Sequence, residues 1–77
     1  MIVETEYGKI TAKHETIQQI MNLCTASQLW DDTQIEKYGK EGNTELEHAF
    51  RVTYGITEKV WNQLFDALHP HFGEEEE

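Results

Sequence analysis

The chain has 77 residues, of which 38% are hydrophobic and 10% aromatic, and 15 acidic against 6 basic residues give it a formal net charge of −9. This length gives room for one domain of modest stability, and the apolar and aromatic content is too high for a disordered chain. The negative charge opposes binding to nucleic acid and to anionic membranes, and it favours a basic partner.

The N-terminus has neither the basic start nor the continuous apolar stretch of a signal peptide. No run of the sequence approaches the roughly 20 apolar residues that a membrane-spanning helix needs. The single cysteine, Cys24, cannot form an internal disulfide, which fits a reducing compartment. We therefore expect a cytoplasmic protein.

Residues 2–11 show the alternation of a β-hairpin. Val3, Thr5 and Tyr7 fall on one face of a strand, Gly8 offers a turn, and residues 9–11 return. Because a two-stranded hairpin is only marginally stable in water, we expect this one to rest on helices.

Two helices are predicted after the hairpin. Between residues 12 and 26 the apolar side chains follow the spacing of one helix face, and these are Ile17, Ile20, Met21 and Cys24. A capping box at Thr33 begins a short helix that Gly39 ends. Gly42 and Asn43 then form a turn.

The second half of the chain predicts two further helical segments. Thr44 and Glu47 form another capping box, which begins a helix that Gly55 stops. Thr57 caps a last helix that Pro70 closes. The last helix carries a wide apolar stripe, made of Val60, Trp61, Leu64, Phe65 and Leu68.

The predicted fold is therefore mostly α, of the α+β class, with three to four helices, an N-terminal β-hairpin and a C-terminal helical hairpin. We expect residues 1–73 to form a single globular domain. The four glutamates at 74–77 are expected to form a disordered acidic tail, as like-charge runs at chain termini usually do.

Residues 46–68, LEHAFRVTYGITEKVWNQLFDAL, resemble the helix-turn-helix motif, because two helices are predicted to meet at a three-residue turn that contains Gly55. Its core positions fall on Phe50, Tyr54, Ile56, Trp61 and Leu64. Arg51 departs from the pattern, since a small residue usually stands four positions before the turn glycine. The resemblance implies a DNA-binding transcriptional regulator, which we keep as an alternative function.

The second helix of that motif has the wrong chemistry for DNA. A recognition helix needs polar side chains on base edges and basic neighbours on phosphates. The exposed positions here carry one base and two acids, at Glu58, Lys59, Asn62, Gln63 and Asp66.

Metal, cofactor and catalytic motifs are weak or missing. The four histidines are His14, His48, His69 and His71, and no two of them have the i, i+4 spacing that places two ligands on one helix face. Cys24 lies on the apolar side of its helix, where a small buried side chain is the simpler interpretation. We predict no enzyme, no metal site and no cofactor.

The acidic middle of the chain is the candidate partner-binding site. Six acids fall within 17 residues, at Asp31, Asp32, Glu36, Glu41, Glu45 and Glu47. Trp30, beside the first two, is the candidate aromatic anchor, because buried aromatic side chains dominate interface energies. The alternative is an ordinary solvated face that also caps helix N-termini, with Trp30 in the core.

The leading functional hypothesis is a non-enzymatic protein-binding module that inhibits or regulates a nucleic-acid-handling protein by occupying its basic surface. A nucleic-acid mimic is one form of this hypothesis. Small acidic proteins of this type include phage-encoded inhibitors of host restriction, CRISPR (anti-CRISPR) or transcription machinery. A monomer or homodimer is expected. A third hypothesis is a structural or assembly protein that oligomerises through Trp61 or Trp30.

Overall fold

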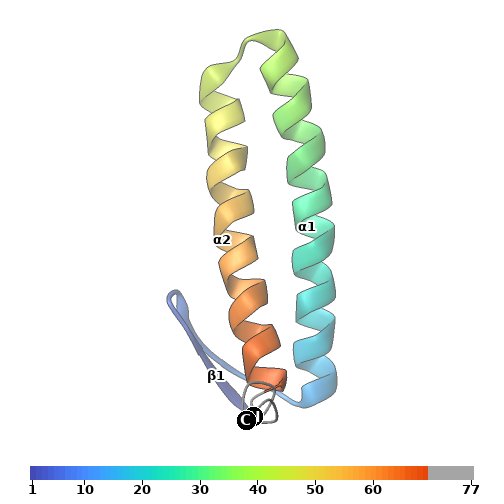
Figure 1. The fold of residues 1–77 in the computed structure, drawn as a ribbon, viewed down its shortest axis with the longest axis vertical. Helices are drawn as coiled ribbons and strands as arrows, with labels where there is room; N and C mark the ends of the chain where they lie inside the picture. The colour runs from blue at the N-terminus through green and yellow to red at the C-terminus, as the bar shows by residue number, and fades with distance from the viewer. Residues whose placement is uncertain (70–77) are drawn as a thin grey trace, which may run out of the picture.

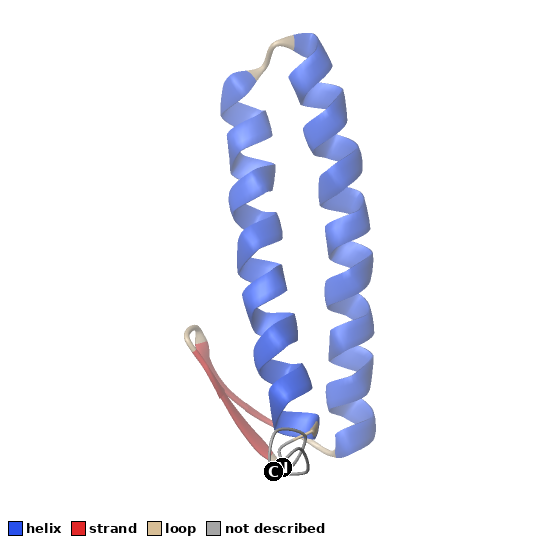
Figure 2. Ribbon diagram, in the orientation of Figure 1, coloured by secondary structure: helices blue, strands red, loops and turns tan. Residues whose placement is uncertain are grey.

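The computed structural model describes residues 1–69, which form a β-hairpin followed by two long antiparallel helices (Figures 1 and 2). The elements are β1 (Ile2–Thr5), β2 (Gly8–Thr11), α1 (His14–Glu41) and α2 (Thr44–Leu68). The β-hairpin lies beside α2 at the end where α1 begins, which we call the base end; the opposite end is the turn end. No helix within this described range is long and apolar enough to cross a membrane. The mostly α class and the N-terminal hairpin are confirmed, but there are two helices where we predicted three to four.

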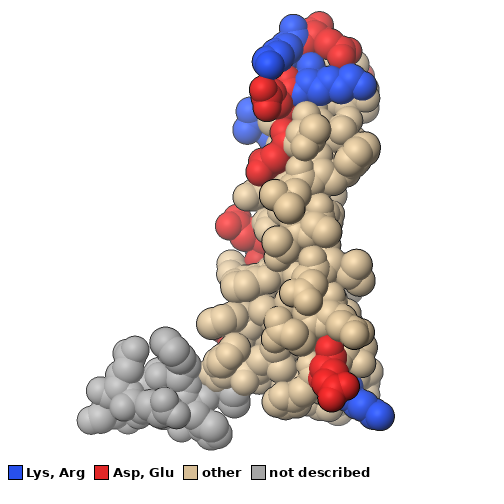
Figure 3. All heavy atoms as spheres, turned by 90° about the vertical axis from the view of Figure 1, so that its right-hand side faces the viewer, with Lys and Arg blue, Asp and Glu red and all other residues tan. Residues whose placement is uncertain are grey.

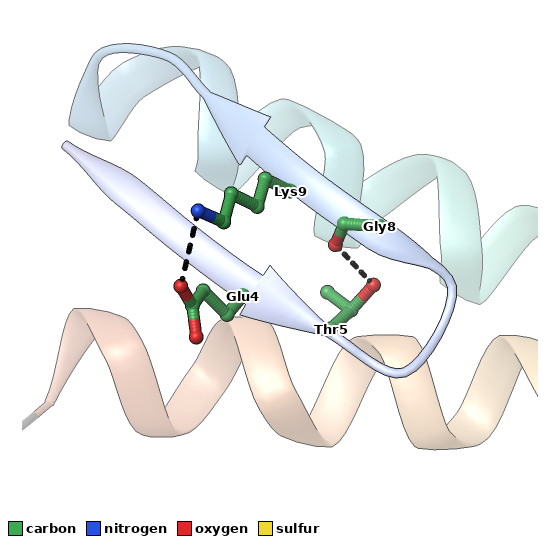
Figure 4. Close-up of polar contacts among 4 residues, drawn as sticks. All are labelled: Glu4, Thr5, Gly8 and Lys9. Carbon is green, nitrogen blue, oxygen red and sulfur yellow. Dashed lines mark hydrogen bonds and ion pairs between the residues drawn. The ribbon is translucent and has the colours of Figure 1, made fainter.

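The turn of the β-hairpin comes before Gly8, whereas the sequence predicted the turn at Gly8 itself. Thr5 pairs with Gly8, so the turn comes before the glycine and Gly8 begins β2 with φ 141°. The Thr5 hydroxyl donates to the Gly8 carbonyl at 2.7 Å and accepts from the Tyr7 amide at 3.1 Å. Glu4 and Lys9 face each other across the strands at 3.5 Å (Figure 4).

α1 is one continuous helix of 28 residues, so the separate short helix ending at Gly39 was a wrong prediction. Residues 27–32 contain no glycine or proline, and the helix continues through them. Thr33 does not cap, because its hydroxyl donates back to a carbonyl four residues earlier at 3.0 Å. The helix stops at Gly42, which takes the left-handed conformation with φ 74° and lets the Asn43 amide reach the Tyr38 carbonyl at 3.0 Å.

α2 is likewise continuous over 25 residues, and the predicted helix-turn-helix is absent. Gly55 lies inside the helix and does not have the positive φ that makes a glycine a C-cap. Thr57 donates to the Thr53 carbonyl at 2.9 Å, as a mid-helix threonine does. The N-cap is Asn43, whose side chain accepts from the Leu46 amide at 3.2 Å. The helix ends at Leu68, while Pro70 and the predicted acidic tail lie outside the described residues.

The buried apolar residues gather near the base end. Val3, Ile17, Met21 and Leu64 form the core, and partly buried side chains surround them: Ile10, Ala12, Ile20, Val60, Trp61, Phe65, Ala67 and Leu68. Toward the turn end, the helices are joined by Tyr38 and Phe50, whose rings stack at 5.8 Å. The half of the helical hairpin near the turn end therefore has no fully buried aliphatic side chain among the described residues.

Candidate functional site

The structure separates the three consecutive residues at the centre of the predicted site. Successive residues of an α-helix point about 100° apart, and Trp30, Asp31 and Asp32 lie in the middle of α1. Trp30 is 60% exposed, Asp31 is only 2% exposed, and Asp32 is exposed. The prediction that Trp30 and both carboxylates act together on one surface is therefore wrong in its geometry, because it assumed a break in the helix at this point.

Asp31 faces α2, and one oxygen of its carboxylate has no partner. Tyr38 stacks on Phe50 across the helix pair, and Asp31 lies one heptad before Tyr38. Because the two helices are antiparallel, Asp31 lies opposite the part of α2 that is one heptad after Phe50, near Thr57. Its Oδ2 is buried and makes no hydrogen bond with any described residue. Burial, followed by the neighbouring charge of Asp32, raises the pKa of the Asp31 carboxyl above its usual range.

The other predicted carboxylates divide into paired and unpaired groups. Glu36 bonds Lys40 at 2.9 Å and Glu47 bonds Arg51 at 3.2 Å, each pair four residues apart on its own helix. The remaining two, Glu41 and Glu45, are exposed at the turn end and form no ion pair within residues 1–69. An ion-paired carboxylate is less available to a partner than a free one.

One side of the helical hairpin collects carboxylates from both helices. An oxygen of Glu47 lies 3.0 Å from the position that a Cβ on Gly39 would occupy, so these two residues share a side. Asp32 lies one heptad before Gly39, and Glu36 lies one turn after Asp32. On α2, Glu58 lies three turns after Glu47 and so points the same way. We call Asp32, Glu36, Glu47 and Glu58 the acidic flank; Figure 3 shows carboxylates running down one edge of the molecule.

Large apolar side chains lie on the opposite side. Trp30 and Ile56 each precede a residue of the acidic flank by two positions, or about 200° of helix, so they face away from it. Leu23 lies one heptad before Trp30, and Val52 lies one turn before Ile56. These four side chains are 69%, 60%, 48% and 41% exposed, for Leu23, Trp30, Val52 and Ile56 respectively. We call them the apolar flank.

The apolar flank is also free of charge. Residues 16–30 of α1 and 52–57 of α2 contain no acidic or basic side chain. In Figure 3 the face of α1 turned to the viewer is uncharged between the charged groups at the two ends of the molecule. Over the middle of the hairpin, one side is therefore acidic and the other apolar, whereas at the turn end Lys37, one heptad after Trp30, places a charge on the apolar side.

The residues that the DNA-binding alternative needs are poorly placed. Gln63, one of the two amides proposed for base edges, has a buried Oε1 without a hydrogen bond in the described structure. Lys59, the one basic residue of the predicted recognition helix, pairs with Glu6 of the β-hairpin at 3.7 Å. With the turn at Gly55 absent, the motif that suggested this function is lost.

The histidines and the cysteine do not form a recognisable reactive centre. His14 and His69 line an open depression at the base end, together with Glu15, Gln18, Gln19 and Leu68. No group of three metal-ligating side chains occurs within residues 1–69, and His71 lies outside that range. Cys24 is half-buried, and burial raises the pKa of its thiol, which disfavours the reactive thiolate.

Sequence reasoning missed one member of the acidic flank. Glu58 was assigned to a recognition helix because Gly55 was interpreted as a helix stop. Its spacing of three turns from Glu47 was the available signal, and it has meaning only in an unbroken helix.

No protein-family model, no curated protein and no solved structure matches this chain.

Proposed function

We propose that the protein is a small non-enzymatic protein-binding module that places its acidic flank on the basic surface of a nucleic-acid-handling protein, as an inhibitor or regulator. The observation that carries the proposal is the gathering of Asp32, Glu36, Glu47 and Glu58 on one side of two helices. Surfaces that bind nucleic acid are rich in lysine and arginine, and an opposite charge both attracts such a surface and competes for it.

Two of the four carboxylates supply most of the free charge. Asp32 and Glu58 form no ion pair with any described residue, whereas Glu36 and Glu47 are shared with Lys40 and Arg51. Arginine or lysine side chains of a partner are expected to contact Asp32 and Glu58 first. The longer-range field of the molecule, with its net charge of −9, favours rapid association with a basic partner at low salt.

The proposal is tested by neutralising the flank. We expect Asp32→Asn combined with Glu58→Gln to weaken capture of a nucleic-acid-handling protein from the native host's lysate, by roughly tenfold at low salt, because exposed charge pairs each contribute up to about 1 kcal/mol. The captured protein should also be released by added duplex DNA or RNA. Mass spectrometry of the bound fraction and titration of the purified partner provide the measurements.

A matched control changes the same net charge elsewhere. Glu15→Gln with Glu41→Gln removes two exposed carboxylates that lie off the acidic flank, and binding should remain close to wild type. Equal weakening by both double variants would reduce the effect to overall charge and contradict a flank-specific site. A gel shift of duplex DNA by the protein alone at low salt would instead favour the DNA-binding alternative.

A further inference from the structure

The part of the helical hairpin near the turn end has a polar interior. We call residues 31–57 the turn half, which holds the end of α1, the turn and the beginning of α2, and we call residues 1–30 and 58–69 the base half. Among the described residues, the two that are buried in the turn half are Asp31 and Gln34, both polar. The four buried apolar residues all lie in the base half. Because burial of apolar surface is the dominant favourable term in folding, the turn half is the more weakly held of the two.

The remaining contacts between the helices in the turn half are partial. Ile35, Phe50 and Tyr54 are only half-buried, and Tyr38 stacks on Phe50 at 5.8 Å. The two ion pairs of this half each join residues four apart on one helix, so they do not hold the two helices together. Packing between the helices is therefore weak from the level of Asp31 to the turn.

The helices themselves are also less stable in the turn half. Gly39 and Gly55 both lie within helices, and a glycine in a helix interior lowers the equilibrium for helix formation by roughly fivefold compared with alanine. Thr53 and Thr57 donate their hydroxyls to carbonyls four residues earlier, at 3.0 and 2.9 Å, which slightly destabilises a helix. Both the helices and their packing thus favour local opening here.

Asp31 adds an uncompensated carboxylate to this half. Its side chain is 2% exposed, and Oδ2 has no hydrogen bond with any described residue. Burial, followed by the charge of Asp32, raises the pKa of its carboxyl, which means that the closed hairpin disfavours the ionised form. Separation of the two helices would return this carboxylate to water.

No basic side chain of the described residues offsets that charge. The element packed against this part of α1 is α2, because the β-hairpin contacts α2 and not α1. Around Thr57, which lies opposite the carboxylate, the titratable side chains of α2 are Tyr54 and Glu58. The nearest bases of α2, Arg51 and Lys59, are held in ion pairs with other acids.

We infer that the turn half is a conformational device: residues 31–57 open as one unit while the base half stays folded, and the charge on Asp31 sets how often they open. Local opening of a supersecondary unit with few buried apolar contacts is a common behaviour of folded proteins. Opening would separate Asp32 and Glu36 from Glu47, and so would reversibly take apart the acidic flank. The inference concerns the chain alone and does not depend on the proposed function.

The opening should depend on pH in one direction. Below the ordinary aspartate pKa of about 3.9, Asp31 is protonated in both the closed and the open form, so its charge has no effect. Above that value the open form loses the proton first, because the pKa of Asp31 is raised in the closed form. Opening therefore becomes more frequent as the pH rises, and it levels off once the pH passes the raised pKa.

Amide hydrogen exchange of the full chain, followed residue by residue by NMR, tests whether the two halves are separate units. In the wild type, helical amides of the turn half should exchange through a common opening that is easier than the one exposing the base half. Ile17→Val, a mild change at a fully buried position of the base half, should speed exchange of the base half about threefold to tenfold and leave the turn half unchanged. Equal acceleration of both halves by Ile17→Val would show a single unit and overturn the proposal.

Asp31→Asn tests the role of the charge, with Asp32→Asn as the matched control. Each variant is compared with the wild type at the same pH, so that the intrinsic exchange rates cancel. We expect Asp31→Asn to slow exchange of the turn half about tenfold at neutral pH and to have little effect at about pH 3. Asp32→Asn removes an exposed charge and should change the rates by less than about twofold. Equal rates in the two variants at neutral pH would rule out control by Asp31.

Discussion

Asp31 places a carboxylate at a position that the fold buries. Its side chain is 2% exposed, it lies between two helices, and Oδ2 has no hydrogen bond in residues 1–69. A buried polar group without a partner costs about 1 to 3 kcal/mol. The sequence placed this residue on a binding face because its neighbours are acidic, but in a continuous helix the position belongs to the interhelical side.

We expect Asp31→Asn to raise the free energy of unfolding at pH 7 by about 1 to 3 kcal/mol, since it removes a buried charge while keeping the shape of the side chain. The pKa of Asp31 is raised in the folded protein, so its ionisation favours the unfolded state. The stabilisation should thus be small in acid, where Asp31 is protonated in both states. It should grow as the pH rises above the ordinary pKa of an aspartate in the unfolded chain, and level off once the pH passes the raised pKa of the folded protein. Urea titrations at several pH values between about 3 and 7, a range that includes the ordinary pKa of a carboxyl group, measure this change in the free energy of unfolding.

Asp32→Asn is the matched control for Asp31→Asn, because Asp32 is the exposed neighbour of Asp31. Its effect on stability should stay within about 0.5 kcal/mol. A loss of stability in Asp31→Asn at neutral pH would contradict an unpaired, buried carboxylate at this position.

At the scale of elements, three glycines in the helical region behave in three ways. Gly42 has a φ of 74° and ends α1, whereas Gly55 lies inside α2 with open space around it. Gly39 lies in the last turns of α1, close to Glu47. Sequence reasoning treated Gly39 and Gly55 as helix stops, and it was right only about the turn at Gly42 and Asn43.

The same substitution should therefore have opposite effects at two sites. Gly55→Ala should stabilise the protein by about 0.5 to 1 kcal/mol, because alanine loses less backbone entropy in a helix and the added Cβ meets no atom within 4 Å. Gly42→Ala should destabilise it by about 1 kcal/mol, because an alanine is strained at positive φ. Thermal unfolding of the two variants tests the pair, and a loss of stability in Gly55→Ala would contradict an unbroken α2.

The N-terminal hairpin was predictable from its alternation, and the boundary between the two helices from the turn residues at 42–43. The continuity of the helices was not, because a short window cannot tell whether a glycine such as Gly55 takes a positive φ or stays helical. That distinction depends on packing against the other helix, which stacks Tyr38 on Phe50 across a separation of twelve residues in the chain.

At the scale of the whole molecule, the pairing of two long helices sorts side chains that are neighbours in the sequence onto different sides. Glu36 and Glu47, from different helices, come together on the acidic flank, whereas Trp30 is moved away from Asp32. The acidic composition of residues 31–47 was therefore visible in the sequence, but the side of the helical hairpin on which each carboxylate lies was not. Membership of a flank depends on the register of two helices, which only the folded hairpin defines.

The two tryptophans give the molecule a pair of internal optical reporters with different positions. Trp61 stacks on Phe65 at 5.2 Å beside the core, while Trp30 stands out from the middle of α1. In dilute solution, a small neutral quencher such as acrylamide should therefore extinguish the emission of Trp30 well before that of Trp61, as Trp30→Phe and Trp61→Phe variants would separate. Loss of the easily quenched component on addition of a binding partner would then report the covering of Trp30 in real time, without any added label.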